Sequence, residues 1–256
     1  MAEKIVTLYD KSSHTCLLFT GLVEGEGIPS NQLVIIDHGE AALFDPGGEL
    51  TYTPLSIELS KYIAIKQLKY VFASHQDPDI ITSLPRWLVH TNCKVVTSKL
   101  WARFLPHLVS DFISGTMDKS LTNRLIELPD KGGKLTLGEA PIVAVPAHFL
   151  HSVGNFHFYD PISKILFSGD VGAAITPGQD HVPVDDFESH CPLMEGFHKR
   201  YMASNAACRH WVKTVRKLDI EMMIPQHGKP FFGKSMVNQF FDWFEELECG
   251  IDLLAD

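Results

Sequence analysis

The sequence predicts an α/β fold in which two β-sheets face each other and helices cover their outer faces, an αββα sandwich. Two observations predict this class. Short apolar runs separated by turn residues dominate the first two thirds of the chain, whereas amphipathic helical patterns appear in the last third. Sheets that must bury one face each, together with helices that must bury one stripe each, pack most simply as layers.

The strand pattern is clearest in "QLVIIDHGEAALFD", residues 32–45, where two apolar β-branched runs flank His38-Gly39 and end at the turn "DPGG". "YVFAS" (70–74) and "CKVVTS" (93–98) predict two more strands. Between them, "ITSLPRWLVH" (81–90) predicts a helix, and "KLWARFLPHLVSDFISG" (99–115) predicts another that is interrupted at Pro106.

Further strands follow in the middle of the chain. "KLTL" (134–137) and "PIVAVP" (141–146) are short strand-like runs. "NFHFYD" (155–160) and "KILFSGD" (164–170) alternate with period two around Asp160-Pro161 and predict a hairpin.

The C-terminal third begins with a helical stripe. Apolar residues recur at spacings of three, four and seven and predict one amphipathic helix from 194 to 218: Met194, Phe197, Tyr201, Cys208, Trp211, Val212, Val215 and Leu218. "EMMIP" (221–225) predicts a strand, and "SMVNQFFDWFEELE" (235–248) predicts a final helix.

Composition limits the classes of function. The 256 residues fit a single domain spanning 1–256. The net charge of −9 argues against broad contact with nucleic acid. We expect no membrane span and no secretory signal, because no apolar run approaches about 20 residues. The five cysteines are scattered and form no CxxC pair, which predicts reduced thiols and a cytoplasmic protein.

Candidate metal ligands follow four of the predicted strands. His75, Asp77 and Asp79 alternate after "YVFAS", and the other three ligands are His151, Asp170 and His227. Imidazole and carboxylate groups together are ligands for a divalent transition metal. Each residue also has an ordinary structural interpretation, such as Asp170 capping a helix or "DPD" forming a turn. Four ligand-bearing strand ends in one chain favour a metal site.

These residues make the sequence resemble the metallo-β-lactamase superfamily and, within it, the diiron domain of flavodiiron proteins. The superfamily's zinc hydrolases carry HxHxDH and flavodiiron proteins carry HxExDH, where this chain has His75-Gln76-Asp77-Pro78-Asp79-Ile80. The resemblance continues through "FLHSVGNFHFYDPISKILFSGDVG", "MEGFHKRYMASN" and "LDIEMMIPQHG", so it covers nearly the whole chain.

The resemblance implies two iron ions (Fe²⁺/Fe³⁺) joined by a hydroxo, oxo or peroxo bridge. His75, Asp77, His151 and one oxygen of Asp170 would hold the first ion. Asp79, His227 and the other oxygen of Asp170 would hold the second.

The chain departs from the flavodiiron pattern at three points. Asp77 is one methylene shorter than the family's Glu, and Ile80 replaces a ligand His. No flavodoxin domain follows, so no FMN is expected in this chain. His148 and Tyr201 are candidates for hydrogen bonding to a ligand held on the metal, although His148 is equally interpretable as a surface residue and Tyr201 as core.

The leading hypothesis is a non-haem diiron protein that binds dioxygen or nitric oxide and serves as an oxygen sensor in chemotaxis signalling, with a signalling receptor as partner. One alternative is an O₂ or NO reductase supplied with electrons by a flavodoxin or rubredoxin. Another is a zinc-dependent hydrolase that uses a metal-bound hydroxide. The resemblance also suggests a homodimer, and the expected partners include no nucleic acid and no membrane.

Overall fold

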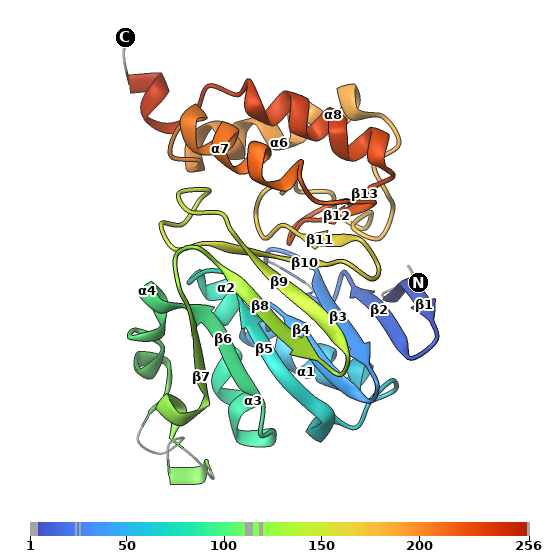
Figure 1. Cartoon of the computed structure of the whole chain (residues 1–256), viewed down its shortest axis with the longest axis vertical. Helices are drawn as coiled ribbons and strands as arrows, with labels where there is room; N and C mark the ends of the chain where they lie inside the picture. Colours follow the sequence, from blue (N-terminus) through green and yellow to red (C-terminus); the bar gives the residue numbers. More distant parts are fainter. Residues whose placement is uncertain (1–4, 24, 26, 111–114, 118–119, 255–256) are drawn as a thin grey trace.

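Two β-sheets pack face to face with helices on both outer faces, as Figure 1 shows. The computed structural model describes residues 5–23, 25, 27–110, 115–117 and 120–254. Within these ranges the first sheet has seven strands in chain order: β1 (Ile5–Lys11), β2 (His14–Phe19), β3 (Gln32–Asp37), β4 (Glu40–Phe44), β5 (Leu68–Ala73), β6 (Lys94–Ser98) and β7 (Leu125–Leu128).

The second sheet is built from the later part of the chain. Its described strands run in the order β13-β12-β11-β10-β9-β8, with bounds β8 (Gly133–Leu137), β9 (Ala140–Pro146), β10 (Phe156–Asp160), β11 (Ile165–Phe167), β12 (Met222–Ile224) and β13 (Phe231–Phe232). Both sheets are mixed: β4, β5, β6 and β7 are parallel neighbours, as are β11 and β12, and the other pairs are antiparallel. The predicted hairpin is β10 and β11.

An aromatic core fills the space between the sheets. The ring centroid of Phe44 lies 4.6 Å from that of Phe72 on the neighbouring strand and 5.6 Å from that of Phe158 on the opposite sheet. These rings are at most 1% exposed. Burial of such large rings from both sheets holds the two layers together.

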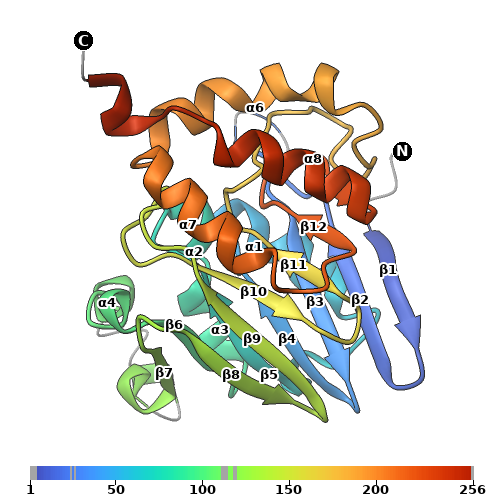
Figure 2. The ribbon, with the colours of Figure 1, turned by 45° about the horizontal axis from the view of Figure 1, so that its top comes forward.

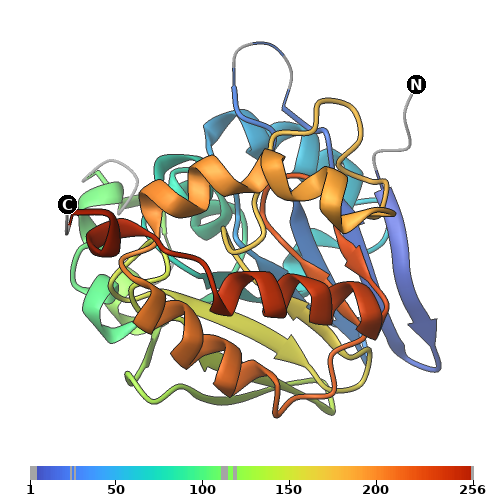
Figure 3. The same cartoon turned by 90° about the horizontal axis from the view of Figure 1, so that it is seen from above.

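Helices bury a second core on each outer face, which Figures 2 and 3 show from other directions. Tyr52, Leu55 and Trp87 pack with Val34 and Val71 of the first sheet. The helices on that side are α1 (Glu49–Leu59), α2 (Pro78–Ile81), α3 (Leu84–His90) and α4 (Lys99–Ala102).

The second sheet has its own helical layer. Trp211, Phe240 and Phe244 pack with Leu166 and Met223 of that sheet. The helices are α6 (Phe187–Tyr201), α7 (Asn205–Val215) and α8 (Lys234–Glu245), and short 3₁₀ turns lie at Ile65–Gln67, Leu105–Leu108, Leu121–Arg124 and Gly250–Leu254. The predicted sandwich is therefore confirmed.

Three predicted helices were wrong in extent. The single helix predicted for 194–218 is two helices, because Met202 is extended and forms a β-bridge with Leu150, and the Ser204 hydroxyl caps α7. The helix predicted for 81–90 is divided into α2 and α3 at Thr82-Ser83.

In the segment 99–115 only α4 and the 3₁₀ turn Leu105–Leu108 are described up to residue 110, and 111–114 lie outside the described residues. Helix α1 and strands β1, β2, β7 and β13 were not predicted. No described helix is both long and apolar enough to cross a membrane.

Candidate metal centre

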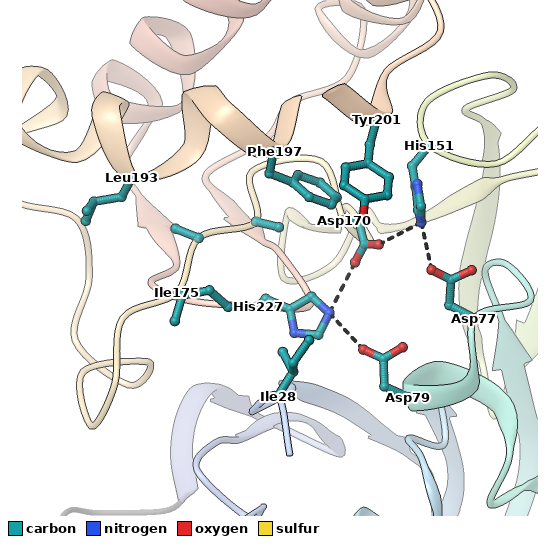
Figure 4. Close-up of a pocket in the computed structure, with 12 residues that line it drawn as sticks. Ile28, Asp77, Asp79, His151, Asp170, Ile175, Leu193, Phe197, Tyr201 and His227 are labelled. Atoms are coloured by element: carbon teal, nitrogen blue, oxygen red, sulfur yellow. Dashed lines mark hydrogen bonds and ion pairs between the residues drawn. The ribbon is translucent and has the colours of Figure 1, made fainter. Parts of the chain in front are cut away.

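The six predicted ligands converge on one end of the sandwich, where Figure 4 shows five of them around a pocket. His75 lies two residues after β5, Asp170 three residues after β11 and His227 three residues after β12. The loop after β9 carries His151. Because these strand ends meet at the same edge of the two sheets, distant segments of sequence become neighbours.

One half of the site gathers His75, Asp77 and His151 around one oxygen of Asp170. The Nε2 atoms of His75 and His151 lie 3.3 and 3.5 Å from Asp170 Oδ2. Asp77 Oδ2 lies 2.8 Å from His151 Nε2 and 3.8 Å from His75 Nε2. Ligand atoms from these four residues all lie within 4.8 Å of one another, a spacing that a single ion can bridge.

The other half uses the second oxygen of the same aspartate. His227 Nε2 lies 3.4 Å from Asp170 Oδ1 and 3.4 Å from Asp79 Oδ2. Asp170 therefore faces both halves, with one oxygen toward each, as Figure 4 shows. This is the partition of ligands that the resemblance implies.

Local backbone geometry explains how each ligand is aimed. Asp77 precedes helix α2 as an extended N-cap residue, and Pro78 begins the helix, so Asp79 falls in its first turn. His151 adopts a left-handed conformation with φ of 70°, which the Asn155 side chain supports by donating to the carbonyl of Leu150.

Gly169 makes the sharp turn before Asp170. Its φ of 51° is one that side-chain-bearing residues rarely adopt, and an added Cβ would lie 3.7 Å from Ser74 Oγ. The turn directs Asp170 back across the strand ends toward both groups of ligands.

Two contacts that hold the predicted histidine ligands in place were not predicted from the sequence. His75 Nδ1 lies 2.8 Å from Ser74 Oγ, which donates to the fully buried carboxylate of Asp45 at 2.6 Å. His227 Nδ1 donates to the carbonyl of Pro29 at 2.7 Å. Such contacts orient the ring nitrogen that faces the ion. Asp45 belongs to the "DPGG" motif, which as sequence indicates only a turn.

The electrostatics of the site favour a cation. Burial opposes protonation of His75, but the carboxylate of Asp170 outweighs it and raises the pKa of His75 to about 9. Burial likewise opposes ionisation of Asp170, and the neighbouring His75 reverses this and lowers the pKa of Asp170. Burial dominates at Asp45 and raises its pKa to about 6. Carboxylates are thus ionised where positive charge is close to them.

The residues present fit a pair of divalent ions. His75 Nε2 and Asp170 Oδ1 are buried, and although polar atoms of described residues lie 3.3 and 3.4 Å from them, neither atom forms a hydrogen bond of normal geometry with a described residue. Buried polar atoms normally find a partner, and a missing one points to a ligand or ion. Three imidazoles and three carboxylates form a nitrogen and oxygen donor set suited to iron, zinc or manganese.

An open cavity of about 320 Å³ lies over the two halves. Leu193, Phe197 and Tyr201 of α6 stand on one side of it, and Ile28 and Ile175 on the other, as Figure 4 shows. The rest of its lining is Asp77, Asp79, His151, Asp170, Ala173, Ala174 and His227. The cavity is therefore polar at the ligands and apolar elsewhere, which suits a small, weakly polar ligand.

Tyr201 and His148 differ in position. The Tyr201 ring is 52% exposed rather than core, and its centroid lies 5.1 Å from that of His151 and 4.7 Å from that of Phe197. His148 Nε2 donates to the carbonyl of Asp130 at 2.8 Å, and His148 is absent from the cavity lining. The structure thus keeps Tyr201 beside the site and directs one nitrogen of His148 elsewhere.

Ile80 is fully buried in α2, directly after the predicted ligand Asp79. Of the other histidines, His157 and His198 are buried near the site. Burial lowers the pKa of His157 to about 3 and that of His198 to about 4. His198 donates to the carbonyl of Met194 and accepts from the backbone of Gly172, which identifies it as a structural residue that ties α6 to the turn after Asp170.

Comparison with known proteins adds a family to this geometry. Residues 28–228 match the model described as "ODP family beta lactamase". The chain is also 23% identical over 231 residues to an uncharacterized protein of Methanocaldococcus jannaschii. That match covers 89% of this chain but 55% of the relative, so the chain spans about half the length of the curated relative it matches.

Solved structures show the same fold over the whole chain. The structure titled "Peroxy diiron species of chemotaxis sensor ODP" is 37% identical, with a TM-score of 0.84 and 98% of each chain covered. The apo state of the chemotaxis sensor ODP from T. denticola is 38% identical, with a TM-score of 0.82 and coverage of 98% and 97%. Rubredoxin:oxygen oxidoreductase of Desulfovibrio gigas matches at 15% identity, with a TM-score of 0.76 over 91% of this chain and 59% of that one.

Proposed function

Because this chain belongs to the ODP family of the β-lactamase fold, we propose that it is a non-haem diiron protein that binds dioxygen and acts as an oxygen sensor in chemotaxis signalling. The observation that carries the proposal is the pair of half-sites sharing Asp170, one oxygen toward each. A relative of nearly the same length, 37% identical, is titled a peroxy diiron species of a chemotaxis sensor.

Two iron ions at the site would supply the electrons and the open coordination positions that dioxygen binding requires. His75, Asp77 and His151 would hold one ion, and Asp79 and His227 the other, with Asp170 between them. Ile80 offers no ligand atom, so the second ion would keep a position open to a small molecule.

The residues around the predicted ligands would control which small molecules enter the cavity and how long they remain bound. Phe197 and Tyr201 cover one side of the cavity, and Ile28 and Ile175 the other. These apolar walls reduce the water near a bound gas molecule. The His75–Ser74–Asp45 chain and the Pro29 contact hold two imidazoles in fixed orientations, so that ligand binding need not reorganise them.

Oxygen exposure of ferrous-loaded protein tests the proposal. The protein is stripped with a chelator, loaded anaerobically with ferrous salt, desalted and exposed to air while its visible spectrum is followed. We expect two irons per chain and a ligand-to-iron charge-transfer band that lasts for minutes. Fully loaded protein that develops no such band would refute oxygen binding.

The same preparation separates a sensor from the two alternatives. With reductant and a flavodoxin or rubredoxin present, a sensor consumes oxygen in one event, whereas a reductase consumes it continuously. A preparation that binds zinc in preference to iron and hydrolyses esters or thioesters would identify a metallo-hydrolase.

A receptor or other signalling protein is the partner that we propose for a sensor of this kind, and nitric oxide is a second ligand to assay at the same site. The expected homodimer stays a prediction, which sedimentation of the purified chain measures. The cytoplasmic location also stays a prediction, which fractionation of cells measures.

A further inference from the structure

Two cysteines outside the metal centre lie against each other. Cys208 is in helix α7, and Cys249 lies between the end of α8 and the C-terminal 3₁₀ turn, 41 positions later. Their sulfur atoms are 3.7 Å apart, and neither residue is exposed. The remaining cysteines are Cys16, Cys93 and Cys191, and all five are free thiols.

The sulfurs need a small movement to bond. A disulfide has an S–S distance of about 2.05 Å, so the two atoms must approach by about 1.7 Å. Cys208 is fixed by its helix. The backbone of Cys249 is held by Asp252, whose N–H donates to the Cys249 carbonyl and whose carboxylate accepts from the Cys249 N–H, so rotation of the two side chains and a small shift of this turn must supply the approach.

The contact also prepares one thiol for reaction. Either thiol can donate to the other sulfur at 3.7 Å, so a thiolate that forms on one cysteine is stabilised by the S–H of the other. The thiolate is the form of cysteine that attacks an oxidant. Because Gly250, the residue after Cys249, lines a surface cavity, we take Cys249 as the attacking sulfur and Cys208 as the sulfur that completes the bond.

A path from solvent ends close to this pair. A surface cavity of about 530 Å³ lies between the end of α6 and the C-terminal turn. Gly250, the residue after Cys249, lines it together with Lys199, Arg200, Met202 and Ala203. A small oxidant therefore reaches the residue next to Cys249 without unfolding of the chain.

We propose that Cys208 and Cys249 form a reversible disulfide when the protein meets hydrogen peroxide. The Cys249 thiolate attacks one oxygen of peroxide, the O–O bond breaks, and a sulfenic acid and, after proton uptake, water result. The Cys208 thiol then attacks that sulfur and displaces a second water. Two thiols and one peroxide thus give one disulfide and two waters, with two electrons passing from sulfur to oxygen.

The bond would act next to the metal centre. The backbone N–H of Ile251 donates to the carbonyl of Ala203, and the N–H of Ala203 donates to the carbonyl of Phe149, two residues before the ligand His151. Gly250 sits so close to this segment that a Cβ would lie 2.2 Å from the carbonyl oxygen of Met202. A disulfide at Cys249 fixes the C-terminal turn against the residues that hold the His151 loop.

Thiol counting and peptide mapping test the pairing. The full chain is kept metal-free with a chelator, so that iron chemistry plays no part, and is treated with hydrogen peroxide and then alkylated in denaturant. We expect the number of alkylated thiols to fall from five to three. We also expect a peptide pair joining Cys208 to Cys249, and full reversal by dithiothreitol.

Variants give the matched controls. Cys249→Ser and Cys208→Ser each remove the linked peptide, whereas Cys191→Ser keeps it, because Cys191 lies in α6 and forms no part of the pair. If Cys208→Ser fails to fold, Cys249→Ser alone decides, since it lies near the end of the chain. A second readout is hydrogen exchange of the amides of 250–254, which we expect to slow at least tenfold on oxidation.

The proposal is overturned if all five thiols survive peroxide in the wild-type chain, if Cys249 proceeds to sulfinic acid without pairing, or if the recovered disulfide joins Cys191 of two chains. Because the experiment uses metal-free protein, none of these outcomes bears on oxygen binding.

Discussion

A buried histidine, His14 at the start of β2, lies between two carboxylates and joins the two sheets. His14 Nδ1 lies 2.9 Å from Asp37 Oδ1, and His14 Nε2 lies 2.8 Å from Asp160 Oδ2. All three residues are at most 3% exposed. Since Asp37 ends β3 of the first sheet and Asp160 ends β10 of the second, the contact spans the layers. Both ring nitrogens face carboxylates, so both carry a proton and donate, and the imidazole is positively charged.

We predict that His14→Leu destabilises the protein by about 3–5 kcal/mol at pH 6, because it removes the buried cation that Asp37 and Asp160 share and leaves Asp160 buried without a cationic partner. For a chain of this size that corresponds to a fall in Tm of about 6–20 °C. The effect depends on pH. Burial opposes the charge on His14, but Asp160 and Asp37 outweigh it and raise the pKa of His14 above its usual value of 6.5.

A group with a raised folded pKa contributes its full stability below its unfolded pKa. That contribution is lost as pH rises through the folded pKa, so we expect the difference in free energy of unfolding between wild type and His14→Leu to narrow as pH is raised above 6.5. The assay is urea unfolding of chelator-treated protein at each pH. The exposed His38, which also contacts Asp37, supplies the control His38→Asn, expected to cost less than about 1 kcal/mol. A His14→Leu cost below 1 kcal/mol, or one independent of pH, would refute the reasoning.

Three further predictions concern the metal centre. Asp170→Asn removes the shared negative charge, so iron content after anaerobic loading should fall from two per chain to one or none by elemental analysis; two retained irons would contradict the shared role. Ile80→His adds an imidazole next to Asp79 in sequence, so loss of the second iron to a chelator should slow about tenfold or more. Ile80→Leu is the control and should lose iron at the wild-type rate. Equal rates in all three proteins would show that position 80 does not set the affinity for the second iron. Tyr201→Phe keeps the ring against His151 but removes the hydroxyl, so the charge-transfer band formed in air should decay about tenfold faster at unchanged iron content. An unchanged rate of decay would mean that Tyr201 only packs against His151.

The layers and the convergence of the six predicted ligands were predictable because they rest on short-range patterns. Alternation and β-branched runs identified β3, β4, β5 and β6, and the polar residues that follow β4 and β5, Asp45 and Ser74, lie beside the site. The ligand set followed from a motif whose spacing survives in sequence, even with Ile80 in place of a histidine.

What sequence could not supply depends on contacts between distant segments. The helical stripe from Met194 to Leu218 continues across the break at Met202, because both α6 and α7 turn their apolar sides to the same sheet. The pairing of Met202 with Leu150 that ends α6 arises only in the folded chain. Asp45 supports His75 through Ser74, although its own motif indicates nothing more than a turn.

The two halves of the metal centre differ in what the chain contributes to them. His75 is 1% exposed at its side chain and is held from behind by Ser74 and Asp45, whereas the Asp79 side chain is 37% exposed at the cavity. The first half is therefore part of the core, and substitutions there would also disturb core packing. Besides Asp170, the second half has two predicted ligands, Asp79 and His227, and Ile80 adds none. The affinity of this half for an ion would therefore depend on the partly exposed Asp79 and on His227. With two ions bound, this asymmetry would leave the second half open to a small ligand while the first half anchors the pair. The proposed reversible sensor needs that difference, whereas a hydrolase with two equally closed sites does not.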